Sequence, residues 1–244
     1  MKKLITILSS IMLSLSLIGF VSYGNDKQLL MSKSLSEVLV CLPTDTLKPL
    51  QKIVHHAEKQ SELYCVYDGS YRGMEYPGGD IERSRGVCTD VLIRSLRAGN
   101  IDLQKLIHVD MKRDLEIYNK RYKTKAIDAN IDHRRTQNIQ TYLTRIGGAK
   151  LDISEMSLGE FKPGDILFWD IAAGHTGIVV NAKNADNSNY LVVHNIGNGP
   201  EYEDLLSYMA PFDAYRLQEF HIKKMQAGSS YAHDFKTDPY FIDE

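Results

Sequence analysis

Three residues that lie far apart in the sequence have the side chains needed for nucleophilic catalysis by a thiol. They are Cys88 in Gly-Val-Cys-Thr-Asp, His175 in Gly-His-Thr-Gly-Ile, and His194 in Val-Val-His-Asn. A cysteine that opens a helix is favoured as a thiolate by the helix dipole and by unpaired backbone amides, so we expect a lowered pKa for Cys88. His175 starts one apolar, strand-like run and His194 ends the next, so a hairpin would bring both rings to one end of a sheet. We interpret His175 as the base that shares the Cys88 proton and His194 as the residue that orients its ring.

Each of these residues also has a purely structural interpretation. A cysteine is often a small buried apolar side chain, and a core histidine is often satisfied by a backbone carbonyl. One cysteine and two histidines can also bind zinc, but the chain lacks a close-spaced ligand pair such as Cys-x-x-Cys. Residues 128–139 start like a calcium loop, yet His133 replaces the required glycine and Ile139 the required glutamate. We therefore predict no metal and no cofactor.

A dense polar segment, Asn-Ile-Asp-His-Arg-Arg at 130–135, precedes a helical pattern. Asp132 is a candidate helix cap, and Arg134 or Arg135 has the planar fork that binds a carboxylate of a substrate. The alternative is a solvated helix start without a ligand.

The pattern that must position these residues changes from helical to strand-like along the chain. Helical spacing of apolar residues predicts helices over 46–59, 88–98, 102–118 and 133–146, with a Gly- and Tyr-rich loop over 64–85. β-rich runs between turn residues predict strands over 165–169, 175–181, 190–195 and 214–217. Helices followed by an antiparallel meander indicate the α+β class.

The chain begins with a pattern typical of export. Residues 1–24 have the charged, apolar and small-residue regions of a cleaved signal peptide, so we expect a periplasmic or secreted protein with no membrane span after cleavage. We expect residues 25–222 to form a single domain and 223–244 a loosely held tail. A net charge of −2 lacks the basic field that nucleic-acid binding needs. Three cysteines leave one thiol over if Cys41 pairs with Cys65; three unpaired thiols are equally compatible with the sequence.

The segments around the histidines resemble the catalytic half of NlpC-type papain-like cysteine peptidases of the cell wall. The resemblance is carried by Lys-Pro-Gly-Asp-Ile-Leu-Phe-Trp at 162–169, by Gly-His-Thr-Gly-Ile-Val at 174–179, and by Val-Val-His at 192–194. It implies a papain-like fold with the nucleophile helix packed on the sheet. Those peptidases commonly carry a tyrosine about a dozen residues before the nucleophile, which implies that Tyr76 helps to position the reacting groups.

A second resemblance covers nearly all of the chain after residue 24, to the bacterial domain-of-unknown-function family 1287. It is carried by Tyr-Pro-x-Gly-Asp at 76–80, Gly-Val-Cys-Thr-Asp at 86–90, residues 130–135, Pro-Gly-Asp at 163–165 and His-Asn-Ile-Gly at 194–197. The NlpC-type peptidases usually have an aspartate directly before the nucleophile, where this chain has Val87. That difference implies that other nearby groups read the substrate, and Asp80, Arg83 and Asp90 are the candidates.

These observations together predict a cysteine-dependent amidohydrolase or peptidase that acts on peptidoglycan stem peptides, or on the amide between glycan and peptide, through an acyl-enzyme. The oligomeric state is left open. A non-catalytic module that binds a muropeptide or an envelope protein is one alternative. A thiol acyltransferase on the same fold is another.

Overall fold

The first helix of the structure packs on the helix that begins at Cys88. The computed structural model describes residues 46–120 and 126–229. Helix α3 (Pro49–Gln60) starts with a proline in its first turn, and buries Ile53, Val54 and Ala57 on one face, as the sequence predicts. Gly99, just after α4 (Cys88–Ala98), lies so close to α3 that a Cβ atom there would stand 2.7 Å from the Ile53 side chain. The predicted boundaries of α4 are confirmed.

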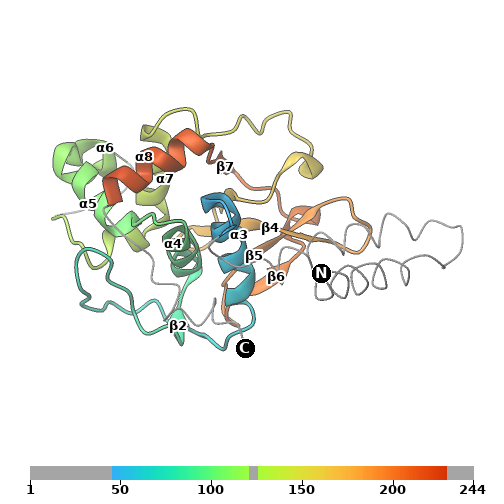
Figure 1. The fold of residues 1–244 in the computed structure, drawn as a ribbon, viewed down its shortest axis with the longest axis horizontal. Helices are drawn as coiled ribbons and strands as arrows, with labels where there is room; N and C mark the ends of the chain where they lie inside the picture. The colour runs from blue at the N-terminus through green and yellow to red at the C-terminus, as the bar shows by residue number, and fades with distance from the viewer. Residues whose placement is uncertain (1–45, 121–125, 230–244) are drawn as a thin grey trace, which may run out of the picture. The chain divides into compact units, whose positions relative to one another are not determined.

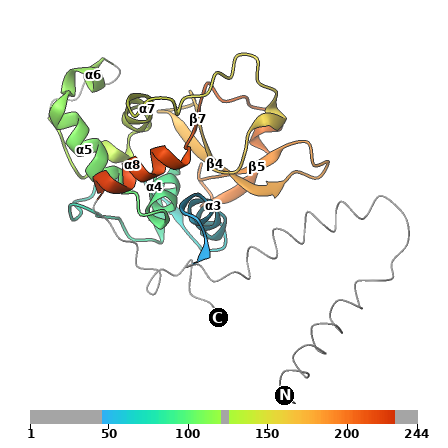
Figure 2. The same ribbon diagram turned by 45° about the horizontal axis from the view of Figure 1, so that its top comes forward.

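The next predicted helix, 102–118, is two helices. Helix α5 (Leu103–Arg113) is capped by Asp102, and α6 (Leu115–Asn119) follows it. Asp114 separates them because its backbone is not helical (φ −154°, ψ 67°). The predicted helix 133–146 is also shorter, since a 3₁₀ turn, η2 (Asp132–Arg134), takes its first residues and α7 runs over Thr136–Arg145. Figures 1 and 2 show α5, α6 and α8 (Glu219–Ser229) gathered on the side of α4 away from the strands.

The second half of the domain is one five-stranded antiparallel sheet in the order β6-β5-β4-β3-β7. Its strands are β3 (Asp165–Trp169), β4 (His175–Lys183), β5 (Tyr190–His194), β6 (Glu201–Glu203) and β7 (Asp213–Arg216). The α+β prediction is confirmed. Strand β6 is additional to the four predicted strands. Strand β7 returns to pair with β3 instead of extending the meander.

Both faces of the sheet are covered, and β3 shows how. Ile166 and Phe168 point into the larger core with side chains of α3, α4, α5, α7 and α8. Leu167 and Trp169 point into a second core, with Phe161, Leu205 and Leu206 from the loops and 3₁₀ turns on the opposite face. Successive residues of β3 therefore pack into opposite cores. Because both faces of the strand are buried, its sequence is a continuous apolar run.

The predicted tail boundary at residue 223 is wrong because it falls inside helix α8. Ile222 and Met225 are both part of the larger core. At the end of the helix the Ser229 hydroxyl accepts a hydrogen bond of 2.9 Å from the Asp102 amide. Residues up to Ser229 therefore belong to the domain, and the described residues all lie in one compact unit. The predicted signal peptide and Cys41 lie outside the described residues.

The loop over 64–85 is tied down at several points. Its ends form a short parallel pair, β1 (Val66–Tyr67) with β2 (Arg85–Gly86). The Met74 amide donates to Asn130 over 2.9 Å, and the Gly78 and Gly79 amides donate to Asp102 and Gln104, also over 2.9 Å. In the described parts of the chain no helix has both the length and the apolar composition needed to cross a bilayer.

Candidate active site

Cys88 is the first residue of α4, where the chain changes from the extended backbone of Val87 (φ −125°, ψ −173°) to helix. The backbone N–H groups of Thr176, Thr89 and Cys88 itself favour the thiolate and act to lower the pKa of the thiol. Burial opposes these donors and, with the nearby charge of Asp90, raises the pKa of Cys88 to about 11. The thiol is thus protonated at neutral pH, and the expected lowering of its pKa is wrong for this structure.

The two histidines meet at one end of neighbouring strands. His175 starts β4 and His194 ends β5, and His175 Nε2 lies 3.0 Å from His194 Nδ1 with the rings nearly perpendicular. Both side chains are buried. Thr176, whose backbone N–H acts on the pKa of Cys88, directly follows His175. The structure therefore brings the start of α4, with Cys88, to the end of the sheet where both predicted histidines lie.

The third member of this chain of contacts, Glu203 on β6, was missed by the sequence analysis. Its carboxylate Oε2 lies 2.7 Å from His194 Nε2. Strand β6 is only three residues long and follows a Gly-rich turn, so no periodic pattern marks it. Only the pairing of β5 with β6 brings Glu203 next to His194.

The hydrogen-bond chain fixes which nitrogen is the base. A carboxylate only accepts, so His194 Nε2 carries the proton and His194 Nδ1 is left as an acceptor. His175 Nε2 then donates to it, which leaves a lone pair on His175 Nδ1. Burial and the neighbouring His194 lower the pKa of His175 to about 4, while Glu203 acts in the opposite direction. His175 is therefore neutral and able to take a proton.

The tyrosine near the thiol is Tyr67 and not Tyr76. Tyr67 pairs with Gly86 in the β1–β2 ladder, two residues before Cys88. Burial raises the pKa of the Tyr67 hydroxyl, and negative charge on Cys88 contributes, so the two groups are close. Tyr76 instead lies against His108, with ring centroids 4.7 Å apart, and Asp102 beyond the far end of α4 acts on its pKa. Since α4 is about 16 Å long, the structure does not bring Tyr76 to the thiol.

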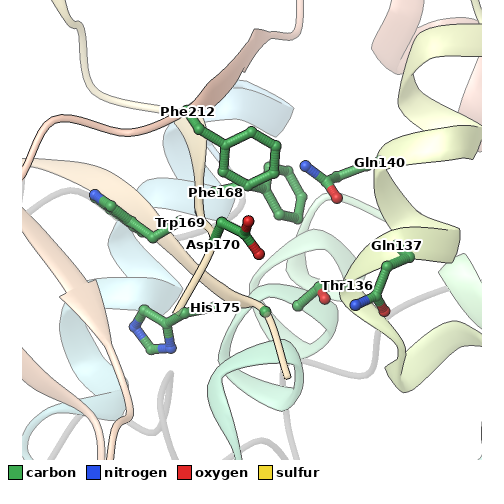
Figure 3. Close-up of a pocket in the computed structure, with 9 residues that line it drawn as sticks. Thr136, Gln137, Gln140, Phe168, Trp169, Asp170, His175 and Phe212 are labelled. Atoms are coloured by element: carbon green, nitrogen blue, oxygen red, sulfur yellow. The ribbon is translucent and has the colours of Figure 1, made fainter. Parts of the chain in front are cut away.

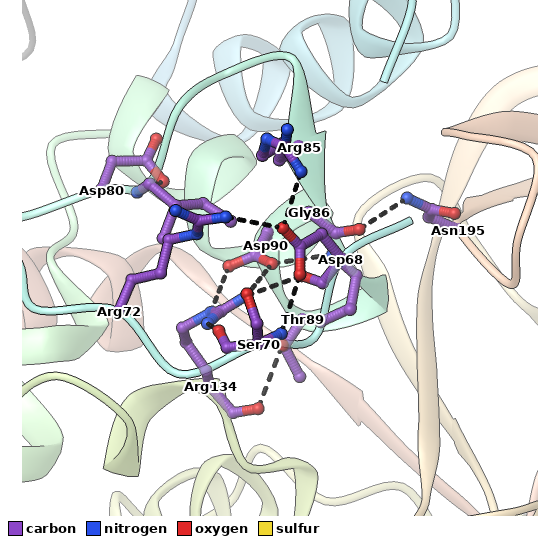
Figure 4. Close-up of polar contacts among 12 residues, drawn as sticks. Asp68, Ser70, Arg72, Asp80, Arg85, Gly86, Thr89, Asp90, Arg134 and Asn195 are labelled. Atoms are coloured by element: carbon purple, nitrogen blue, oxygen red, sulfur yellow. Dashed lines mark hydrogen bonds and ion pairs between the residues drawn. The ribbon is translucent and has the colours of Figure 1, made fainter. Parts of the chain in front are cut away.

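Three of the six predicted substrate-binding residues form internal ion pairs (Figure 4). Arg134 binds Asp90 through two hydrogen bonds of 2.8 Å, and Asp90 also accepts from the Val87 amide at 2.7 Å. Asp80 binds the Arg94 guanidinium at 2.9 Å. These groups hold the start of α4 and the 64–85 loop in place, so the structure gives them a role in positioning Cys88 and not in gripping a ligand.

The other predicted substrate-binding residues are dispersed. Asp132 does not cap α7: its buried carboxylate accepts from the Asp128 amide at 2.6 Å. Arg135 lies close enough to Asp132 for its charge to favour the ionised carboxylate, although burial raises the pKa of Asp132 overall. Arg83 is exposed and lines a cavity of about 150 Å³ that also contains Asp80.

A cavity of about 190 Å³ adjoins the base (Figure 3). Aromatic residues Phe168, Trp169 and Phe212 form one wall, and Thr136, Gln137 and Gln140 of α7 form another. Asp170, Gly174 and His175 complete the lining. Gly174 has φ +95°, and a Cβ atom there would stand 2.3 Å from the Thr136 hydroxyl, so glycine is required where β3 turns into β4.

The remaining thiol, Cys65, is buried beneath the site. It is free in this structure, and Cys41, its predicted partner, lies outside the described residues. Asn195, directly after His194, places its amide 3.2 Å from the Gly86 carbonyl and 4.0 Å from the Cys65 sulfur. Within the described ranges, no group of three His, Cys, Asp or Glu side chains is arranged to hold a metal ion.

Comparison with known proteins shows which family the chain belongs to. The profile of the family described as Domain of unknown function (DUF1287) matches residues 54–217, which include Cys88, both histidines and Glu203. The chain is also 40% identical over 156 residues to "Uncharacterized protein YijF" of Escherichia coli strain K12, covering 63% of this chain and 75% of that protein. No solved structure matches. The chain belongs to the DUF1287 family.

Proposed function

We propose that this chain is an exported, cysteine-dependent amidohydrolase with a papain-like fold, which cleaves an amide bond in peptidoglycan through an acyl-enzyme. One observation carries the proposal. A thiol at the start of a buried helix is acted on by the backbone N–H of Thr176, the residue after a histidine that is oriented by a second histidine and a carboxylate. Nucleophile, base and orienting groups in this relation are the parts that acyl transfer requires.

The protonation states imply a concerted first step. Because Cys88 is a thiol and His175 is a neutral base, the sulfur loses its proton to His175 Nδ1 as it attacks the carbonyl carbon. The carbonyl oxygen gains negative charge and accepts the Cys88 backbone N–H at the start of α4, with the Tyr67 hydroxyl as a further donor. The new positive charge on His175 is stabilised through His194 by Glu203.

The same groups complete the turnover. His175 returns its proton to the leaving amine as the C–N bond breaks, which leaves a thioester on Cys88 and a neutral imidazole. Water then attacks the thioester, gives its proton to His175, and releases the acid while Cys88 regains its proton. An acyltransferase would follow the same steps with an amine or hydroxyl in place of water.

Purified peptidoglycan digested with a muramidase, incubated with the chain and analysed by mass spectrometry, tests the proposal. We expect new fragments from the wild type that are absent with Cys88→Ala and with His175→Ala. Cys65→Ala is the matched control, since it also removes a buried thiol and should leave the fragments unchanged. A mass gain of water identifies hydrolysis, and a product joined to an added amine identifies acyl transfer.

The second candidate is a non-catalytic module that binds a muropeptide. The burial and raised pKa of Cys88 favour it, because a protonated, covered thiol is a poor nucleophile. Equilibrium binding of the digested fragments to the wild type and to Cys88→Ala separates the two. Binding to both without any new fragment supports the module and contradicts the hydrolase.

A further inference from the structure

The cavity beside His175 presents hydrogen-bond acceptors and a negative charge. The Gln137 amide nitrogen donates to the Ala173 carbonyl over 2.9 Å, and that of Gln140 donates to the Asp213 carboxylate over 3.3 Å. Carbonyl and carboxylate oxygens only accept, so these contacts fix the orientation of both amides. One N–H of each glutamine amide is therefore in use, and each Oε1 atom remains able to accept a hydrogen bond.

Asp170 adds a charge that no residue of the described ranges neutralises. Its carboxylate is exposed, lines the cavity, and points between Gln140 and Thr136 in Figure 3. It makes no hydrogen bond or ion pair with any residue in 46–120 or 126–229. The acids around the Cys88 helix behave differently, because Asp80 and Asp90 are each bound to an arginine.

We propose that this cavity binds a primary ammonium group of the substrate, with Asp170 as its counter-charge. The proposal rests on the proposed function in one respect: the molecule that carries the ammonium group is the substrate whose amide bond is cleaved beside His175. An ammonium has three N–H donors and no acceptor, which matches a lining of carboxylate, amide and hydroxyl oxygens. The Phe212 ring beside Asp170 adds a favourable surface for a cation (Figure 3).

The size of the cavity limits the ligand to one end group. A volume of about 190 Å³ is smaller than that of a typical drug-sized pocket, so it admits a terminus or one side chain and not a peptide. The ammonium has two possible sources: the free N-terminus of a peptide or the side chain of a diamino acid. In both cases the substrate amine is read by the turn between β3 and β4, and not by the position before the nucleophile, which is Val87.

Trp169 provides the assay, because it lines the cavity and is the only tryptophan of the chain. Its fluorescence is followed in the Cys88→Ala variant, in which the probes remain intact. Three probes are titrated: Nα-acetyl-lysine methylamide with a side-chain ammonium, alanine methylamide with an α-ammonium, and Nα,Nε-diacetyl-lysine methylamide with neither. The first two arms distinguish the sources of the ammonium.

We expect a saturable change with at least one ammonium probe and binding of the diacetylated probe at least about tenfold weaker. Adding Asp170→Asn should weaken binding of the ammonium probe by about tenfold or more and leave the affinity for the diacetylated probe unchanged. Glu155→Gln removes an exposed carboxylate outside the cavity and should change nothing. Asp170→Glu, which keeps the charge, should retain part of the affinity.

Equal affinity for free and acetylated amines, an Asp170→Asn variant that binds as before, or no saturable response to any probe would each overturn the proposal. These outcomes are independent of turnover. If the ammonium binds as expected but the wild type leaves peptidoglycan intact, the cavity assignment stands and the hydrolase is refuted.

Discussion

Cys88 should react slowly with iodoacetamide at neutral pH and faster as the pH rises. Alkylation requires the thiolate, and burial raises the pKa of Cys88 to about 11 despite the opposing effect of three backbone N–H groups. His175 does not offset this, because burial lowers its pKa to about 4 and it holds no positive charge at neutral pH. The resting site is a neutral pair instead of a thiolate and an imidazolium.

The magnitude follows from the two pKa values. At pH 7 a thiol of pKa about 8.5 is roughly 3% ionised and one of pKa about 11 is roughly 0.01% ionised, a difference of about 300-fold. The more basic thiolate is intrinsically about tenfold more nucleophilic, so alkylation should be about 20 to 30 times slower than that of a free cysteine. The rate should rise about tenfold per pH unit up to pH 10.

Quantitative mass spectrometry after quenching and trypsin digestion measures this rate for Cys88 alone. Cleavage after Arg85 and Arg94 gives a peptide in which Cys88 is the sole cysteine, and Cys65 is read from another peptide of the same digest. His175→Ala should change the rate little, since the neutral imidazole does not stabilise a thiolate. A rate that is constant from pH 5 to 8, exceeds that of free cysteine, and collapses in His175→Ala would show a preformed ion pair and refute this reasoning.

Three further outcomes follow from the same contacts. Glu203→Gln removes the carboxylate that fixes the His194 tautomer, so kcat on digested peptidoglycan should fall about 10- to 100-fold with KM nearly constant; an unchanged kcat would exclude Glu203 from the mechanism. Asp90→Asn leaves the buried Arg134 guanidinium without its counter-charge and should lower the free energy of unfolding in urea by about 3 to 5 kcal/mol. Adding Arg134→Met should restore part of that loss, and a purely additive double variant would contradict the pairing. Burial lowers the pKa of His133 to about 3, so below about pH 6.5 the unfolded chain takes up a proton that the folded chain does not, and stability falls with pH. The His133 contribution between pH 6.5 and 4.5 is about 2 kcal/mol, and His133→Phe should flatten the measured acid dependence accordingly.

The local sequence pattern was sufficient to predict the positions of the site residues that lie in regular helices and strands. Cys88 opens α4 at the predicted residue, because apolar residues at helical spacing follow it and Gly99 ends the run. His175 and His194 lie on adjacent strands because β-rich runs and a turn predict a hairpin. Their contact, 3.0 Å between ring nitrogens, follows from that pairing.

Long-range partners could not be predicted in the same way. Glu203 and Tyr67 lie on strands of three and two residues, which exist only because a neighbouring strand supplies their hydrogen bonds. Arg134 has the planar fork expected of a carboxylate ligand, and it binds a carboxylate, but that of Asp90 in the same chain. Sequence alone does not distinguish a substrate carboxylate from an internal one. The protonation of Cys88 depends on burial, which a helix start does not reveal.

Helix α4 has no residue facing solvent: all eleven are buried. Its charged side chains are therefore matched from three other segments, with Asp90 bound to Arg134, Arg94 to Asp80, and Arg97 to Asp102. Replacing one member of a pair with a neutral residue leaves the buried charge of its partner unpaired, whereas replacing both members together does not. Across relatives of this chain, these six positions should consequently be inherited as three linked pairs, and a homologue that has lost one member should have lost the other.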